Sequence, residues 1–189
     1  MFLIVLPDPI IEDDLLRQLQ RGDESALIAV YEAFFQPLYQ YVRLKTGDRT
    51  LAQDIVSEVF VNLINSLGRP SAPRENLRGW LFRVARNEVS RVIGKARQLP
   101  LADLEDWMPA PPESNPEIQL GDALALERVR HALRMLAAEH QEVLILRFGQ
   151  RLSLQETADI MGKSVSAVKS LQFRAVDTLR SILVEGSHG

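Results

Sequence analysis

The chain of 189 residues contains no cysteine, which excludes disulfide bridges and thiolate metal sites and suits a reducing compartment. Its three histidines are dispersed and lack the spacing of metal ligands. No apolar run approaches the roughly 20 residues that a membrane span requires. The short apolar segment 1–6 lacks the basic start of a secretion signal. We therefore expect a cytoplasmic protein that is not inserted in a membrane and holds neither metal nor cofactor.

The net charge of −3 does not by itself indicate a partner of either sign, but the charges are unevenly distributed. Residues 69–97 carry eight cations against two acids, whereas residues 98–121 carry five acids and no lysine or arginine. Local patches rather than the total charge steer a polyanion. The basic segment is therefore a candidate nucleic-acid surface.

Prolines divide the chain. Residues 98–121 contain five of them, and proline lacks an amide hydrogen and disfavours helix in the residue before it. We expect this acidic segment to be a flexible linker. The predicted organisation is a first domain over residues 1–97, a linker over 98–121 and a second domain over 122–189.

Apolar residues recur at spacings of three and four on both sides of the linker, and no segment alternates as a strand would. The predicted fold is therefore all-α, with two small helical domains. Pro37 predicts a kink or break in its helix, and Thr50 is expected to cap the helix that follows. The expected helices cover residues 13–21, 25–45, 50–67, 80–97, 122–137, 139–148, 154–161 and 165–183.

The segment Trp80–Arg97 combines an aromatic residue with a ladder of cations. Guanidinium and ammonium groups neutralise phosphates, and a flat ring can stack on an unpaired base. The alternative is an ordinary amphipathic helix with a solvated basic face and Trp80 in the core. The residues of this segment that would contact nucleic acid are Trp80, Arg83, Arg86, Asn87, Arg91 and Lys95.

A second signature lies in the C-terminal half. Ser153 and Glu156 form a capping box, and Gly162 follows where a turn needs a left-handed backbone. Ser164 can cap the next helix, which buries Val168. This spacing is typical of a helix-turn-helix, although helical hairpins that bind no DNA share it. Its polar face, which could reach phosphates and base edges, consists of Lys163, Ser164, Ser166, Lys169, Ser170 and Arg174.

Taken together, segments 50–60, 80–87 and 152–179 resemble the motifs of a sigma-70 family sigma factor of the extracytoplasmic-function (ECF) group. The resemblance covers roughly residues 14–183. It implies that the first domain is region 2, which binds core RNA polymerase and melts the promoter. It also implies that the second domain is region 4, which reads the upstream promoter element. The implied partners are core RNA polymerase and promoter DNA, with an anti-sigma factor as an additional partner class.

The resemblance also assigns roles to residues. Asp54, Glu58 and Asn62 would meet the polymerase, although their spacing equally fits a solvated polar face. In the loop before the basic helix, Arg74, Asn76 and Arg78 would hold a flipped base. In the second domain, Lys169, Ser170, Phe173 and Arg174 occupy the usual contact positions. The linker would thread the polymerase or act as a plain tether.

The sequence therefore predicts a factor that directs promoter-specific transcription initiation by binding. No nucleophile–base pair and no phosphate-cradling glycine loop indicates an enzyme. Two alternatives remain: a stand-alone helix-turn-helix regulator, and a helical interaction protein without DNA recognition. Co-purification with core polymerase separates the first hypothesis from both.

Overall fold

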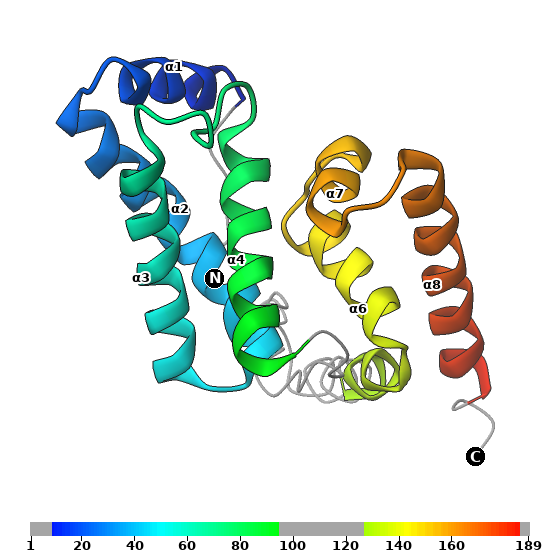
Figure 1. Cartoon of the computed structure of the whole chain (residues 1–189). Coiled ribbons are helices and arrows are strands. Elements are labelled where there is room, and N and C mark those ends of the chain that lie inside the picture. Colours follow the sequence, from blue (N-terminus) through cyan, green and yellow to red (C-terminus); the bar gives the residue numbers. More distant parts are fainter. Residues whose placement is uncertain (1–8, 95–126, 186–189) are drawn as a thin grey trace, which may run out of the picture.

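The structure, a computed structural model, describes residues 9–94 and 127–185, and these form helices joined by short turns (Figure 1). An N-terminal bundle contains α1 (Pro9–Gln20), α2 (Glu24–Thr46), α3 (Arg49–Ser66) and α4 (Leu77–Ile93). A C-terminal bundle contains helical residues 127–135, α6 (Ala138–Leu144), η2 (Ile145–Gly149), α7 (Leu154–Met161) and α8 (Val165–Glu185). The predicted all-α fold is confirmed. Lys95 and the linker 98–121 lie outside the described residues.

The N-terminal bundle is built around aromatic and aliphatic side chains that α2, α3 and α4 bury against one another. Phe34, Tyr41, Leu63 and Phe82 are completely inaccessible to solvent. The rings of Tyr41 and Phe82 meet edge to face with centroids 5.4 Å apart, which joins α2 to α4. Helix α1 lies across the end of the bundle at which α4 begins (Figure 1).

The expected cap of α3 is wrong, and of the kink or break expected at Pro37 the break is absent. Asp48, not Thr50, caps α3, because its side chain accepts a 2.9 Å hydrogen bond from the backbone N–H of Leu51. Gly47 ends α2 in the left-handed conformation, so the extended residue that follows it becomes the cap and Thr50 already lies in the first turn. Pro37 does not break α2, which continues through it. Phe34, Leu38 and Tyr41 around it are buried in the core, and this burial favours a continuous helix despite the hydrogen bond that proline removes.

The predicted signals of the helix-turn-helix are confirmed. The capping box between Ser153 and Glu156 is complete, and Gly162 adopts φ = 65°. The Ser164 hydroxyl accepts from the backbone N–H of Ala167 at 3.2 Å. The helix expected over residues 139–148 divides into α6 and a single π-helical turn, η2.

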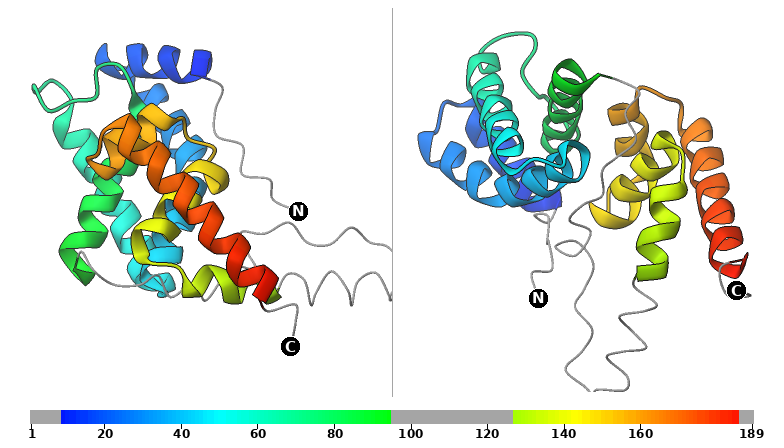
Figure 2. Two further views of the ribbon diagram at one scale, coloured as in Figure 1. Left: turned by 90° about the vertical axis from the view of Figure 1, so that its right-hand side faces the viewer. Right: turned by 90° about the horizontal axis from the view of Figure 1, so that it is seen from below.

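The two bundles pack against each other through one side of α4 and the C-terminal half of α2. Helix α7 packs beside α4, α6 reaches α2 and α4 through the side chain of Glu142, and α8 lies on the outer side of the C-terminal bundle (Figures 1 and 2). Buried side chains of both bundles belong to one hydrophobic cluster. The helix that was expected to read duplex DNA therefore faces away from the N-terminal bundle.

Candidate nucleic-acid interface

The basic helix α4 presents its polar side chains on two different faces. Arg83, Asn87 and Arg91 follow one another at intervals of four residues and are exposed. Arg91, whose side chain is 69% exposed, forms an ion pair at 2.7 Å with the largely covered Glu88, and solvent around the arginine weakens such a pair. This outer face of α4 is therefore open to a strand that runs along the helix.

Trp80 and Asn76 shape the loop of residues 69–76 that leads into α4. The half-buried Trp80 packs against the core and its indole N–H donates to the carbonyl of Ser71 at 3.0 Å. Asn76 caps α4, because its Oδ1 accepts from the backbone N–H of Gly79 at 2.6 Å. From α1, Gln20 Nε2 donates to the carbonyl of Pro73 at 3.1 Å. Three side chains thus hold this loop.

The two arginines that sequence reasoning placed at this loop differ in exposure. Arg74 is exposed. Arg78 is buried against Glu12 of α1, with its Nη2 3.0 Å from Oε2, and its backbone N–H donates to Oε1 at 2.7 Å. Burial raises the pKa of Glu12, and the bonds to Arg78 oppose that rise. Arg78 joins α1 to α4 and cannot reach a nucleic acid without breaking this pair.

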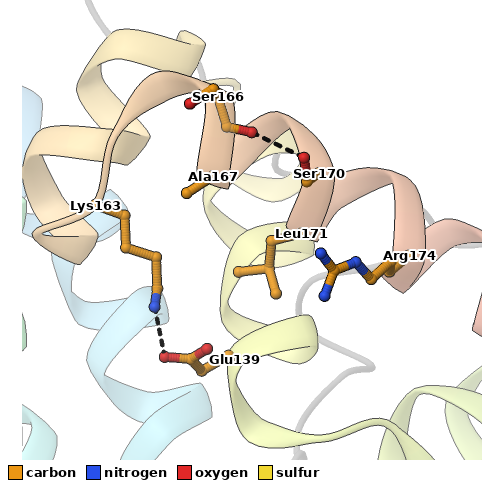
Figure 3. A pocket seen from close by; sticks show the side chains of 7 residues that line it. All are labelled: Glu139, Lys163, Ser166, Ala167, Ser170, Leu171 and Arg174. Atoms are coloured by element: carbon orange, nitrogen blue, oxygen red, sulfur yellow. Dashed lines mark hydrogen bonds and ion pairs between the residues drawn. The ribbon is translucent and has the colours of Figure 1, made fainter.

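On the C-terminal bundle, the polar face of α8 borders a groove of about 370 Å³ (Figure 3). Lys163 and Glu139, which both line it, form an ion pair at 2.9 Å. Figure 3 shows Arg174 at the other end, beside Leu171. The residues lining the groove are Glu139, Lys163, Ser166, Ala167, Ser170, Leu171 and Arg174.

The remaining predicted contacts of α8 are exposed. Lys169 projects into solvent, and the side chain of Phe173 is 73% exposed, which is unusual for a phenylalanine. Ser170 donates to the carbonyl of Ser166 at 3.0 Å, and Ser164 lies 3.0 Å from Ser166 through their hydroxyls. This face combines cations, hydroxyls and one aromatic ring, a composition suited to the edge of a duplex groove.

Helix α3 carries the acids expected to meet a polymerase. Asp54 and Glu58 are exposed one turn apart, and Asn62 is half-buried one turn further. Apolar side chains are exposed beside these acids: Val61 is 46% and Ile64 is 49% exposed. The surface of α3 thus pairs negative charge with apolar area, which would complement a helix carrying cations and apolar residues.

Sequence reasoning missed a buried cluster between the bundles. Glu142 of α6 accepts hydrogen bonds from Tyr41 Oη at 2.9 Å and Arg86 Nε at 3.0 Å, and it forms an ion pair with Lys45. Only 7% of the Glu142 side chain is exposed. The available signal was an acid at the start of the apolar run of residues 143–146. A carboxylate on the buried, apolar side of a helix requires a hydrogen-bonding or cationic partner.

In this cluster, burial and the neighbouring charges shift the pKa values of Glu142 and Lys45 in opposite directions. Burial alone would raise the pKa of Glu142, but the charges of Lys45 and Arg86 outweigh it and hold that pKa below its ordinary value. For Lys45 the balance is reversed, since burial lowers its pKa despite the attraction of Glu142. Burial also raises the pKa of Tyr41, which stays a neutral donor.

Comparisons with known proteins agree with this arrangement. Residues 30–98 match the family model Sigma-70 region 2, and residues 132–181 match Sigma-70, region 4. The chain is 31% identical over 169 residues to the ECF RNA polymerase sigma factor SigL of Mycobacterium tuberculosis (strain ATCC 35801 / TMC 107 / Erdman), covering 86% of this chain and 92% of SigL. The chain belongs to the sigma-70 family. Its relatives place it in the ECF group.

Two further relatives extend the comparison. The ECF RNA polymerase sigma factor BldN of Streptomyces coelicolor is 32% identical over 171 residues, covering 90% of this chain. This sigma-70 family chain spans 65% of the length of BldN. The solved structure of CnrH in complex with the cytosolic domain of CnrY matches with a TM-score of 0.63 and 25% identity, covering 90% of this chain and 96% of that one.

The family assignment fits the placement of the two polar surfaces. The region 2 match includes the exposed face of α4, and the region 4 match includes the groove beside α8. Within residues 9–94 and 127–185, no helix is long and apolar enough to cross a membrane. In the same residues, no three side chains of the metal-ligating types converge on one point.

Proposed function

We propose that this protein binds core RNA polymerase and directs it to specific promoters, where it stabilises the opened strand. The observation that supports this most directly is the presence of two separate polar surfaces matched by region 2 and region 4. A stand-alone regulator would need only the second surface, and an adaptor without DNA recognition would need neither. The protein acts by binding rather than by catalysis, and it would work in the cytoplasm, where transcription takes place.

Promoter contacts are proposed for both bundles. Region 4 would read duplex DNA with the exposed face of α8 and the turn before it, through Lys163, Ser164, Ser166, Lys169, Ser170, Phe173 and Arg174. Region 2 would hold the melted strand with Arg74 and the outer face of α4, through Arg83, Asn87 and Arg91. Trp80 and Asn76 would contribute chiefly by holding the loop of residues 69–76. Because holding the opened strand favours bubble over duplex, binding energy drives melting.

Polymerase binding is assigned to α3. Asp54 and Glu58 would meet cations, and Asn62 would extend this face. The exposed Val61 and Ile64 would bury apolar area in the complex. The resemblance to the ECF group implies an anti-sigma factor as a further partner, and we propose that one binds this chain. CnrH was likewise solved in complex with another protein, the cytosolic domain of CnrY.

The decisive experiment is a titration of the purified chain against core polymerase. We expect stoichiometric binding by the parent and severe weakening by Asp54→Arg with Glu58→Arg, because two charges of the wrong sign then face the cationic partner. The matched control is Glu32→Arg with Asp177→Arg, which alters two exposed acids elsewhere by the same charge. Equal affinity of the two double variants would show that the α3 face is wrongly assigned, and absence of any binding by the parent would refute the function.

A further inference from the structure

The cluster around Glu142 is built as an anion site on the N-terminal bundle. Tyr41 is held by its edge-to-face contact with Phe82, Lys45 lies one turn further along α2, and Arg86 enters from α4. The Tyr41 hydroxyl, the Lys45 ammonium and the Arg86 guanidinium converge on one carboxylate. Charge-assisted donors arranged in this way bind oxyanions strongly.

The occupant of this site comes from the other bundle. Glu142 is separated from Lys45 by 97 positions in the chain and from Arg86 by 56. Its Oε2 also accepts a hydrogen bond from Arg86 Nη2 at 3.4 Å. When the bundles separate, the carboxylate leaves and two cations remain beside one hydroxyl. A phosphodiester carries the same single negative charge and has oxygens that accept the same donors.

The position of Arg86 connects this site to the DNA surface. It lies on α4 between Arg83 and Asn87, yet its side chain is only 26% exposed because the C-terminal bundle covers that side of the helix. The same contact places α7, the first helix of the helix-turn-helix, against α4. With the bundles packed in this way, α8 cannot move independently of α4.

We propose that Glu142 is an internal competitor for a DNA-backbone phosphate at the site formed by Tyr41, Lys45 and Arg86. In the free factor the carboxylate occupies the site and holds the two bundles together, and a phosphate of the promoter strand replaces it once they separate. This inference rests on the proposed function, because it places the melted strand along α4. A buried ion cluster suits such an exchange, since its attraction is largely offset by the loss of hydration.

The first test measures separation of the bundles in the full chain. Because native cysteine is absent, Gln53→Cys on α3 and Thr178→Cys on α8, both exposed, give a unique pair of positions for fluorescent labels. We expect Glu142→Gln to lower energy transfer between the labels. Glu32→Gln, which removes one exposed charge from α2, should leave energy transfer unchanged. Unchanged transfer in Glu142→Gln would overturn the proposal.

Exchanging the charges of residues 45 and 142 controls for variants that lower energy transfer only because they unfold. Lys45→Glu combined with Glu142→Lys keeps three charged groups and one hydroxyl in the cluster with the same total charge. We expect this double variant to recover high energy transfer, with helical content by circular dichroism equal to the parent in every variant. Failure of the exchange to restore transfer when Lys45→Glu alone has lowered it would contradict direct pairing.

The second test uses a fluorescein-labelled single-stranded oligonucleotide and measures anisotropy. If the closed form outnumbers the open form about ten to one, Glu142→Gln should bind the strand about tenfold more tightly than the parent. Adding Lys45→Gln to Glu142→Gln should reverse much of this gain and reduce the salt slope by about 0.7, the value for one lost phosphate contact on a single strand.

The two measurements separate the ways in which the inference could fail. Lower energy transfer with unchanged strand affinity and salt slope would retain the interdomain contact and overturn the phosphate site. A failure of the proposed function would differ from both, because neither parent nor Glu142→Gln would then bind the strand even with core polymerase present.

Discussion

The N-cap of α4 yields a prediction about stability: the sign of the effect of a substitution at Gly79 depends on its contact with Asn76. Asn76 has an extended backbone, and its Oδ1 accepts from Gly79 N–H at 2.6 Å. A Cβ added to Gly79 would lie 2.9 Å from Cγ, Nδ2 and Oδ1 of Asn76. The cap therefore occupies the space that any larger residue at position 79 would need.

Two substitutions of Asn76 test whether its role is capping. Replacing an N-cap by alanine costs about 1 kcal/mol. For a chain of this size, that loss corresponds to a melting temperature lower by about 2–4 °C. Asn76→Ala should show this loss. Asn76→Asp should not, since aspartate keeps the acceptor and places a negative charge at the helix N-terminus, where it is favourable.

Position 79 completes the test as a double-mutant cycle. Alanine normally stabilises a helix by roughly 0.5–1 kcal/mol relative to glycine. In the parent, Gly79→Ala should nevertheless destabilise the protein, because the new Cβ displaces the cap. In the Asn76→Ala background the space is free, and the same substitution should stabilise by roughly 0.5–1 kcal/mol. The effect therefore changes sign between the backgrounds.

Urea unfolding followed by circular dichroism measures all four variants on one scale. The reasoning would be refuted if Gly79→Ala had the same sign in both backgrounds, or if Asn76→Asp lost as much stability as Asn76→Ala. Retained strand binding by Asn76→Asp would also show that the Asn76 amide hydrogens are not required as donors to a base.

Two further predictions concern promoter opening and acidity. Lys169→Ala with Arg174→Ala should lose recruitment to duplex promoter, whereas Arg83→Ala with Asn87→Ala should fail to open it and be partly rescued by a pre-melted template. Each loss should be on the order of tenfold or more, and equal defects on both templates would contradict this division of labour. The pKa of Glu142 is depressed by Lys45 and Arg86 against the effect of burial, so its contribution to closure is complete above its ordinary value of 4.5 and is lost as the pH falls through the lower folded value. Energy transfer between the labelled bundles should therefore stay constant from about pH 5 to 8 and decline only at pH values below 4.5, and a decline between pH 5 and 8 would contradict the assignment. The groups that face Glu142 are Tyr41 and Lys45 from α2 and Arg86 from α4, with Glu139 acting on Arg86 from α6.

Signals that act over a few residues were readable from the sequence. The capping box of Ser153 and Glu156 and the left-handed Gly162 depend on neighbours within one turn, so the helix-turn-helix could be predicted and is confirmed. The helical periodicity likewise predicted the all-α fold. The expectation of a cap at Thr50 was wrong because of where α2 ends. Helix α2 extends to Thr46 and Gly47 ends it, so Asp48 is the first extended residue and caps α3.

Roles that depend on distant partners were decided by the tertiary structure. Arg78 and Arg83 lie in the same basic segment and cannot be told apart from the sequence. In the structure, α1 buries Arg78 in an ion pair with Glu12, whereas Arg83 is exposed. No local pattern assigns Glu142 to an anion site, since its partners lie on α2 and α4 of the other bundle. The sequence thus determined the helices and their polar faces. Packing decided which charges remain available, because a charge loses hydration only when another element covers it.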